Sequence, residues 1–315
     1  MDGPTYSEKR VVQAGLGTVE LALDYIYKRT APGKPGLDEL WYPKLKKWLL
    51  MVDHDAQLAA EEYLEKELGG IEIRGEESTL GRLSGGLAAL LDMLDGSDLL
   101  KRNLGNWCSA ATIFDASVPK IITALVGMPT KEIYFVQNTD STCAFLRTKD
   151  TISGHYQITE VSMQQREIKL QDAAICFYGQ KPGKLSSFSS LQNKMGRWLN
   201  QISKVIDSKK RDYDCPKMRV YTLAGNPMMI NLIEDRIDAV VEMSGQKCHD
   251  VVPGFIIALR AGAALRDLSN QPITEELIAA SLRNPESKFA YVLACSESLA
   301  TELVELLQPT MSLLS

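Results

Sequence analysis

The spacing of apolar residues divides the first part of the chain into two helices with a break between them. Over residues 6–28 the apolar side chains recur at intervals of three and four, which predicts an amphipathic helix. Prolines and glycines in residues 30–36 end this helix. Helical spacing resumes over residues 56–68, and we expect Asp53 or Asp55 to cap this second helix.

Short apolar runs separated by turns follow, which is the pattern of strands. Residues 71–73 have strand character and stop at Gly75, so Glu76 lies where a strand ends. The apolar run at residues 87–94 ends in an acidic turn that contains glycine. Further strands are predicted at residues 107–115, 121–126 and 133–136. Together these runs predict a meander with little room for helices.

The pattern changes at about residue 150, where strands begin to alternate with helices. Strands are predicted at residues 173–178, 220–223, 239–242 and 289–294, and a polar loop at residues 179–190. Helices are predicted at residues 191–206, from residue 226, at 252–264 and at 297–307, the last capped by Ser296. We therefore expect an N-terminal α+β domain, residues 1–150, and a C-terminal α/β domain, residues 151–315.

Composition limits the partners and the location of the protein. Of the 315 residues 45% are hydrophobic and 24% are charged, the balance of a soluble protein with two moderate cores. The formal charge of −5 argues against a nucleic acid polymer or an anionic membrane as partner. The first residues lack the features of a secretory signal, and no apolar run reaches the roughly 18 residues of a membrane span, so we expect a cytoplasmic protein. Six cysteines occur singly, which favours reduced structural thiols over a zinc site.

The segment Asp-Met-Leu-Asp-Gly-Ser at residues 92–97 carries the strongest chemical signal. An apolar strand ends there in Asp92 and Asp95, followed at once by Gly96 and Ser97. If the chain turns into a helix at this point, the amides of Gly96 and Ser97 form an anion site. Flanking carboxylates would repel a phosphate unless divalent cations lay between them, and hard oxygen ligands select Mg²⁺ rather than Zn²⁺.

Two further carboxylates could join this segment. Glu76 lies at the end of a predicted neighbouring strand, and Asp250 lies at the start of an apolar helix in the second half. Taken singly, each is better explained as a solvated or capping residue. His249, beside Asp250, could orient that carboxylate, contact a substrate or simply pack, whereas surface or packing roles are expected for His54 and His155.

These residues, in this order, resemble the inositol monophosphatase family. The resemblance rests on Gly75-Glu76-Glu77-Ser78, on residues 92–97, and on Asp250 at the start of a helix that ends in Arg260-Ala261-Gly262. It covers roughly residues 11–307 in the correct order. The family belongs to a superfamily with fructose-1,6-bisphosphatase and the bisphosphate nucleotidases.

The resemblance implies a fold and an activity. The fold is a layered αβαβα sandwich of the sugar-phosphatase type with two subdomains. The activity is the Mg²⁺-dependent hydrolysis of a small phosphomonoester, such as an inositol phosphate or a sugar phosphate, by metal-activated water. Two or three Mg²⁺ ions and a homodimer are expected on the same ground.

The resemblance also implies roles for individual residues. Metal ligands would be Glu76, Asp92, Leu94 through its carbonyl oxygen, Asp95 and Asp250. Catalytic roles would belong to Glu76, Asp95, Ser97 and Asp55, with Asp55 accepting a hydrogen bond from the Ser97 hydroxyl. Substrate contacts would come from Gly96, Ser97, Gly225 and Glu242. The match of Glu242 requires one inserted residue before Asp250.

Several positions depart from the family pattern, although none of them removes a ligand. The family's Pro-Ile is Met93-Leu94 here, its Thr is Ser97 and its Asn-Phe is Leu99-Leu100. The tryptophan before the last aspartate is His249, and the Glu and second Gly of a later Glu-Ala-Gly-Gly segment are Arg260 and Ala263. These departures indicate a divergent member and leave the substrate open.

Two alternatives follow from the same residues. A sugar bisphosphatase or a 3′(2′),5′-bisphosphate nucleotidase would hold an additional phosphate with basic residues such as Arg219, Lys247 or Arg260. A non-catalytic relative would keep the fold for binding or assembly. The retention of several mutually repelling carboxylates favours catalysis over this second alternative.

Overall fold

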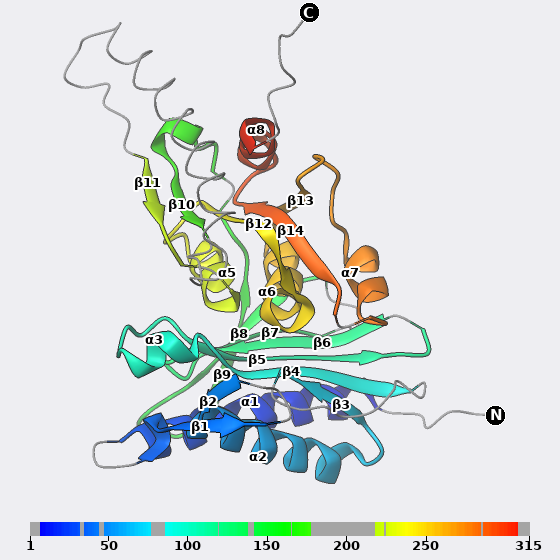
Figure 1. Cartoon of the computed structure of the whole chain (residues 1–315). Coiled ribbons are helices and arrows are strands. Elements are labelled where there is room, and N and C mark those ends of the chain that lie inside the picture. The colour runs from blue at the N-terminus through cyan, green and yellow to red at the C-terminus, as the bar shows by residue number, and fades with distance from the viewer. Residues whose placement is uncertain are drawn as a thin grey trace, which may run out of the picture.

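The chain folds into five layers that alternate between helices and sheets (Figure 1). The computed structural model describes residues 7–31, 35–43, 47–76, 86–118, 120–137, 142–164, 166–177, 218–223, 225–284 and 286–307. Helices α1 and α2 lie below a seven-stranded sheet, and α5 and α6 separate it from a five-stranded sheet, which α8 covers on the outside. The predicted αβαβα sandwich is confirmed.

The first layer contains the two predicted helices, α1 (Glu8–Thr30) and α2 (Met51–Leu68). A 3₁₀ helix (Pro35–Leu37) and a hairpin of β1 (Glu39–Tyr42) and β2 (Lys47–Leu50) join them. Helix α2 follows β2 directly and begins at Met51. The prediction that Asp53 or Asp55 caps it was wrong, because the preceding apolar run forms a strand that leads straight into the helix and both aspartates lie inside its first two turns.

The seven-stranded sheet has its strands in sequence order, β3 to β9. They are β3 (Glu72–Gly75), β4 (Leu87–Asp95), β5 (Cys108–Asp115), β6 (Lys120–Gly127), β7 (Ile133–Gln137), β8 (Ala144–Lys149) and β9 (Tyr156–Val161). Only the β3–β4 pair is parallel, and the remaining pairs form the predicted meander. The β8–β9 hairpin was not predicted, and residue 150 falls in its turn, so the change from one sheet to the other comes after Val161.

The second half supplies the middle helices, the five-stranded sheet and the outer helix. The strands, in sheet order, are β11 (Arg219–Tyr221), β10 (Ala174–Phe177), β12 (Ala239–Lys247), β14 (Lys288–Ala294) and β13 (Ala264–Asp267). The helices are α5 (Asn226–Ile233), α6 (Cys248–Ala261), α7 (Glu275–Ser281) and α8 (Glu297–Leu307), with a 3₁₀ helix at Leu170–Asp172. The predicted Ser296 cap of α8 is confirmed, since its hydroxyl accepts the Leu299 amide at 3.3 Å. The predicted loop 179–190 and helix 191–206 lie outside the described residues.

Two hydrophobic cores lie on the two faces of the seven-stranded sheet. One contains the buried faces of α1 and α2, and the other contains α5, α6 and the second sheet. Both faces of β4 are therefore covered, which explains why its sequence reads as one continuous apolar run. The described cysteines carry free thiols, in line with the sequence. No helix in the described ranges combines the length and apolarity needed to cross a bilayer.

Candidate metal centre

A bulge at the end of β4 determines how its two aspartates point. Asp92 pairs with Ala110 of β5 and Asp95 pairs with Cys108, so three steps along β4 match two steps along β5. Successive side chains of a regular strand alternate between faces, and residues three apart would point in opposite directions. The extra residue of the bulge returns Asp95 to the face on which Asp92 lies.

The two residues between the aspartates point to the opposite face of the sheet. Met93 and Leu94 both pack into the core beneath the sheet, with α1 and α2. The Ser109 hydroxyl of β5 donates to the Met93 carbonyl oxygen at 2.8 Å and holds the bulge closed. Because Ala88 and Leu90 of the same strand belong to the opposite core, Asp92 and Asp95 face the middle helices α5 and α6.

Helix α5 holds Asp95 in place through Asn226, its first residue. The Asn226 amide and its side-chain Nδ2 both donate to Asp95 Oδ2, at 2.8 and 3.2 Å. Asn226 is fully buried, and it also donates to the His249 carbonyl at 3.1 Å and accepts from the Gly254 amide at 2.9 Å. Both bonds to Asp95 reach one oxygen, Oδ2, so neither of them engages Oδ1. The sequence offered no signal for this role of Asn226.

Gly225, just before Asn226, lies too close to Asp95 to carry a side chain. Its φ is +84°, a region that favours glycine. A Cβ atom at this position would lie 2.7 and 2.9 Å from the two oxygens of Asp95. Gly225 therefore allows the approach of α5 to Asp95; the substrate contact implied by the resemblance remains a prediction.

Asp250 and His249 reach the same region from the start of α6, and Glu76 reaches it from the end of β3. Asp250 is the third residue of α6, and its Oδ2 accepts the Lys247 amide at 3.1 Å. The Glu76 amide donates to the Leu91 carbonyl oxygen at 3.1 Å, which ties Glu76 to β4. Glu76, His249 and Asp250 each offer a ligand atom, and these three atoms lie within 4.8 Å of one another.

Burial and mutual repulsion raise the pKa values of both β4 aspartates. For Asp92 burial is the larger cause, followed by the charges of Glu76, Asp95 and Asp250, and its pKa lies well above the usual value. Burial, followed by the charge of Asp250, raises the pKa of Asp95 to about 8, although the Asn226 amide acts in the opposite direction. Four carboxylates from three parts of the chain are thus electrostatically coupled, and a divalent cation among them would let them ionise.

The donor set fits Mg²⁺. Asp92 is only 2% exposed, and its Oδ2 is buried without a hydrogen-bond partner among the described residues. A buried carboxylate oxygen without a donor is unfavourable unless a cation binds it. Carboxylate oxygens are also the ligands that Mg²⁺ prefers.

The turn after Asp95 has the expected shape. Gly96 has φ +91°, and a Cβ atom there would lie 2.9 Å from the Asn106 carbonyl oxygen. The short helix α3 (Ser97–Lys101) begins at once, with the Gly96 carbonyl accepting the Leu99 amide at 2.9 Å. The chain therefore turns into a helix directly after Gly96, which was the condition for an anion site there. The phosphate contacts of Gly96 and Ser97 and the carbonyl ligand of Leu94 remain predictions.

Asp55 and Asp53 have different neighbours. Asp55 accepts hydrogen bonds from Arg29 at 2.9 Å and from the Tyr25 hydroxyl at 3.4 Å. No hydrogen bond among the described residues joins it to Ser97. Asp53 is 5% exposed, and its charge contributes to the raised pKa of Asp92. The structure thus points to Asp53, rather than the predicted Asp55, as the α2 carboxylate near the centre. Its place on the buried stripe of α2 is a signal that the sequence already contained.

Glu242 lies at a second bulge, in β12. The register of β12 against β14 shifts between Glu242 and Gln246, where four steps along β12 match two steps along β14. Glu242 Oε1 accepts from the Ser244 hydroxyl at 2.6 Å and from the Gly245 amide at 2.9 Å. Its Oε2 is buried without a hydrogen-bond partner in the described part of the chain. The substrate contact itself remains a prediction.

The basic residues suggested for a second phosphate are largely engaged elsewhere. Arg260 forms a two-pronged pair with Glu275, at 2.9 and 3.1 Å. Lys247 pairs with Glu286 at 3.0 Å, and Arg219 lies exposed on β11. Arg260 in particular is committed to linking α6 to α7.

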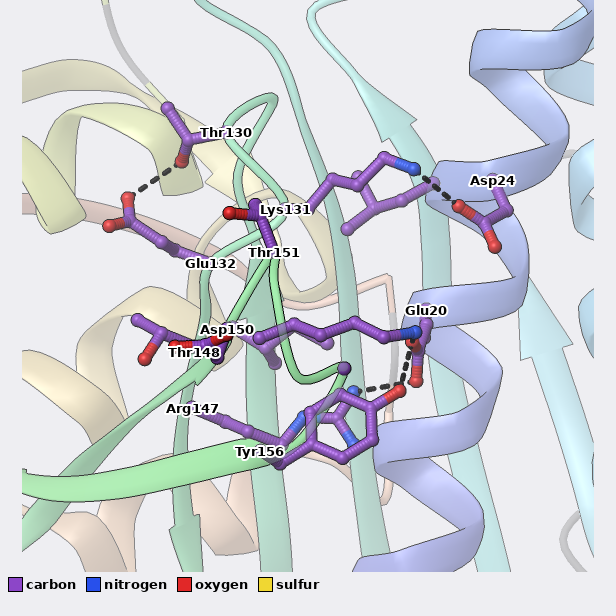
Figure 2. Close-up of a pocket in the computed structure, with 14 residues that line it drawn as sticks. Glu20, Asp24, Thr130, Lys131, Glu132, Arg147, Thr148, Asp150, Thr151 and Tyr156 are labelled. Atoms are coloured by element: carbon purple, nitrogen blue, oxygen red, sulfur yellow. Dashed lines mark hydrogen bonds and ion pairs between the residues drawn. The ribbon is translucent and has the colours of Figure 1, made fainter.

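A separate pocket of about 470 Å³ lies between α1 and the turns of the seven-stranded sheet (Figure 2). Three basic and four acidic side chains line it. Arg147 and Tyr156 both donate to Glu20, and Lys131 pairs with Asp24 at 2.7 Å, as Figure 2 shows. Because these basic groups already face acidic partners, the pocket has no surplus positive charge to attract a phosphate.

Comparisons with known proteins show the fold. No family profile and no curated protein matches the sequence. The extragenic suppressor protein SuhB of Bartonella henselae matches with a TM-score of 0.67 and 13% identity, over 96% of this chain and 99% of that chain. A Pyrococcus horikoshii protein with similarities to inositol-1 monophosphatase matches with a TM-score of 0.64 and 18% identity, over 96% of this chain and 100% of that chain.

A third solved structure is an inositol monophosphatase/NADP phosphatase complexed with Mg²⁺ and phosphate. It matches with a TM-score of 0.64 and 12% identity, over 98% of each chain. At these identities the likeness establishes that this chain has the fold of the inositol monophosphatases.

Proposed function

We propose that this protein is a divergent member of the inositol monophosphatase family and a Mg²⁺-dependent phosphatase that hydrolyses a small phosphomonoester. The observation that carries the proposal is the coupled carboxylate cluster. A bulge turns Asp92 and Asp95 toward α5 and α6, where Asp250 and Glu76 act on their pKa values. An anion-binding protein without a metal would have no use for this arrangement, because the carboxylates would repel its ligand.

The residues would divide the work as follows. The metal would be held by Glu76, Asp92, Asp95 and Asp250, with Leu94 adding its carbonyl oxygen. Glu76 would also orient or deprotonate the attacking water. Two or three Mg²⁺ ions, when bound, would supply Lewis acidity toward the phosphate and the water. The amides of Gly96 and Ser97 would bind phosphate oxygens at the start of α3. A covalent nucleophile is not needed in this scheme.

The substrate class can be identified by comparing the rates of phosphate release from several candidate compounds. Inositol 1-phosphate, fructose 1,6-bisphosphate, adenosine 3′,5′-bisphosphate and NADP represent the candidate classes, the last because a structural neighbour is described as an NADP phosphatase. The pairing of Arg260 with Glu275 favours a single phosphate over two. A homodimer and a cytoplasmic location remain predictions. Sedimentation equilibrium would measure the oligomeric state.

Substitution of Asp95 tests the proposal. We expect Asp95→Asn to lower phosphate release from the best substrate by at least about 10²–10³-fold in saturating Mg²⁺, because one ligand of the reacting centre is lost. The variant should stay folded, since the substitution removes a repelling charge. Asp98→Asn is the matched control, because Asp98 lies three residues away on the exposed face of α3 and should retain full activity. Full activity of Asp95→Asn would refute the scheme.

A further inference from the structure

His249 is the one nitrogen ligand in the group of metal-ligating side chains that the described residues bring together. It stands where the resembling family has tryptophan, it is 8% exposed, and its ring lies beside Asp250 and Glu76. A buried imidazole in an acidic group can pair with a carboxylate or bind the same ion as the carboxylate.

The distance between His249 and Asp250 excludes a hydrogen bond between their side chains. His249 Nε2 lies 3.6 Å from Asp250 Oδ1, too long for a hydrogen bond although a protonated imidazole would form an ion pair there. Two ligands that each lie about 2.1 Å from one ion can be up to about 4.2 Å apart, so the spacing suits shared coordination.

Two observations place oxygen donors around the start of α6. The Asn226 side chain that donates to Asp95 also donates to the backbone carbonyl of His249, so one buried residue ties the start of α6 to Asp95. Asp92 Oδ2 is buried without a hydrogen-bond partner among the described residues, and the charges of Glu76 and Asp250 act on the Asp92 carboxylate. Carboxylates therefore surround the ligand group that contains the His249 nitrogen.

We propose that Nε2 of His249 ligates the metal beside Glu76 and Asp250, and that this nitrogen raises the affinity of the Mg²⁺ centre for first-row transition ions above that of an all-oxygen centre. The inference rests on the proposed function, since it concerns the same centre. Imidazole suits Zn²⁺, Co²⁺ and related ions, whereas Mg²⁺ gains little from a nitrogen ligand. A metal preference shifted toward transition ions follows from one substitution in α6.

Direct metal binding to the full chain tests this without relying on turnover. Metal-free protein would be titrated with Co²⁺ and with Mg²⁺ by calorimetry, as wild type, His249→Phe and the control His155→Phe. His155 lies on an exposed turn. We expect His249→Phe to weaken Co²⁺ binding at least about 10-fold and to leave Mg²⁺ affinity within about threefold. The control should change neither.

A spectroscopic measurement on the wild type covers the case in which His249→Phe does not fold. Bound Mn²⁺ should show ¹⁴N coupling in pulsed electron paramagnetic resonance, and the coupling should persist in His155→Phe. Absence of this coupling, or unchanged Co²⁺ affinity in a folded His249→Phe variant, overturns the role of His249 alone. Absence of saturable binding of both ions to the wild type overturns the proposed function as well.

Discussion

Asp53 and Asp55 stand two residues apart in α2 and differ in what they face. Asp53 is buried and acts on Asp92, whereas Asp55 pairs with Arg29 near the surface. We expect Asp53→Asn to weaken Mg²⁺ binding at least about 10-fold, because it removes a charge beside the metal carboxylates. Asp55→Asn should change Mg²⁺ affinity less than about threefold and the free energy of unfolding by less than about 1 kcal/mol. Calorimetry and urea unfolding measure the two effects, and the reverse order would restore Asp55 to the site.

Alanine substitutions at two glycines with positive φ distinguish the effect of backbone strain from the effect of steric contact with Asp95. Gly225 and Gly262 have φ values of +84° and +103°, so alanine should destabilise either position by about 1–2 kcal/mol. Only at Gly225 would the new Cβ meet the Asp95 carboxylate, at 2.7 Å, while nothing lies within 4 Å at Gly262. We expect Gly225→Ala to weaken Mg²⁺ binding at least about 10-fold and Gly262→Ala to leave it unchanged, as measured by calorimetry. Equal Mg²⁺ affinities in the two variants would show that displacing the Asp95 carboxylate does not affect metal binding.

At the scale of elements, the centre depends on two bulges and two helix starts. The bulge in β4 turns Asp95, and the bulge in β12 lengthens the path from Glu242 to α6. The starts of α5 and α6 then bring Asn226 and Asp250 to the same place. Most residues of the candidate centre therefore lie at bulges, strand ends and helix starts rather than in the regular interior of an element.

The packing of α1 on β6 offers a test of how closely the first layer fits. A Cβ atom on Gly127 of β6 would meet the Val19 side chain of α1 and would lie 2.9 Å from Leu23 Cδ1. We expect Gly127→Ala to lower the free energy of unfolding by about 1–3 kcal/mol, because the helix must shift away from the sheet. Val19→Ala in the same chain should relieve part of this loss, which a double-mutant cycle in urea would measure. Strictly additive changes in the free energy of unfolding would show that residues 127 and 19 are not in contact.

At the scale of the whole molecule, the coupled carboxylates make stability depend on pH and on metal. The folded pKa values of Asp92 and Asp95 lie above the unfolded value, for Asp95 at about 8. Protonation therefore favours the folded state, and this stabilisation is complete below about pH 4 and is lost as the pH rises through about 8.

We accordingly expect the Tm of the metal-free protein to fall by at least about 5 °C between about pH 5 and 8, and saturating Mg²⁺ to remove most of that fall. Thermal unfolding with EDTA and with Mg²⁺ across this range measures it. Asp95→Asn should flatten the metal-free profile. A metal-free Tm that is constant or rises over this range would contradict the coupling.

The sequence by itself determined the order of most elements and the location of the acidic motif. Periodicity is local, so α1, the strands from β3 to β7 and helix α8 could be predicted from short windows. The short strands β1, β8, β9 and β13 were missed because a few residues with mixed polarity carry little periodic signal. The resemblance, which depends on residues far apart in sequence, supplied the layered fold.

Only the tertiary structure decided which side chains share the centre. Whether Asp95 points with Asp92 depends on the pairing of β4 with β5, because a bulge appears only in the register of two strands. Likewise, Asn226 reaches Asp95, and His249 reaches Asp250 and Glu76, through the packing of α5 and α6 on the sheet. Residue types and spacing limit which side chains can bind a metal, and long-range packing determines which of them meet.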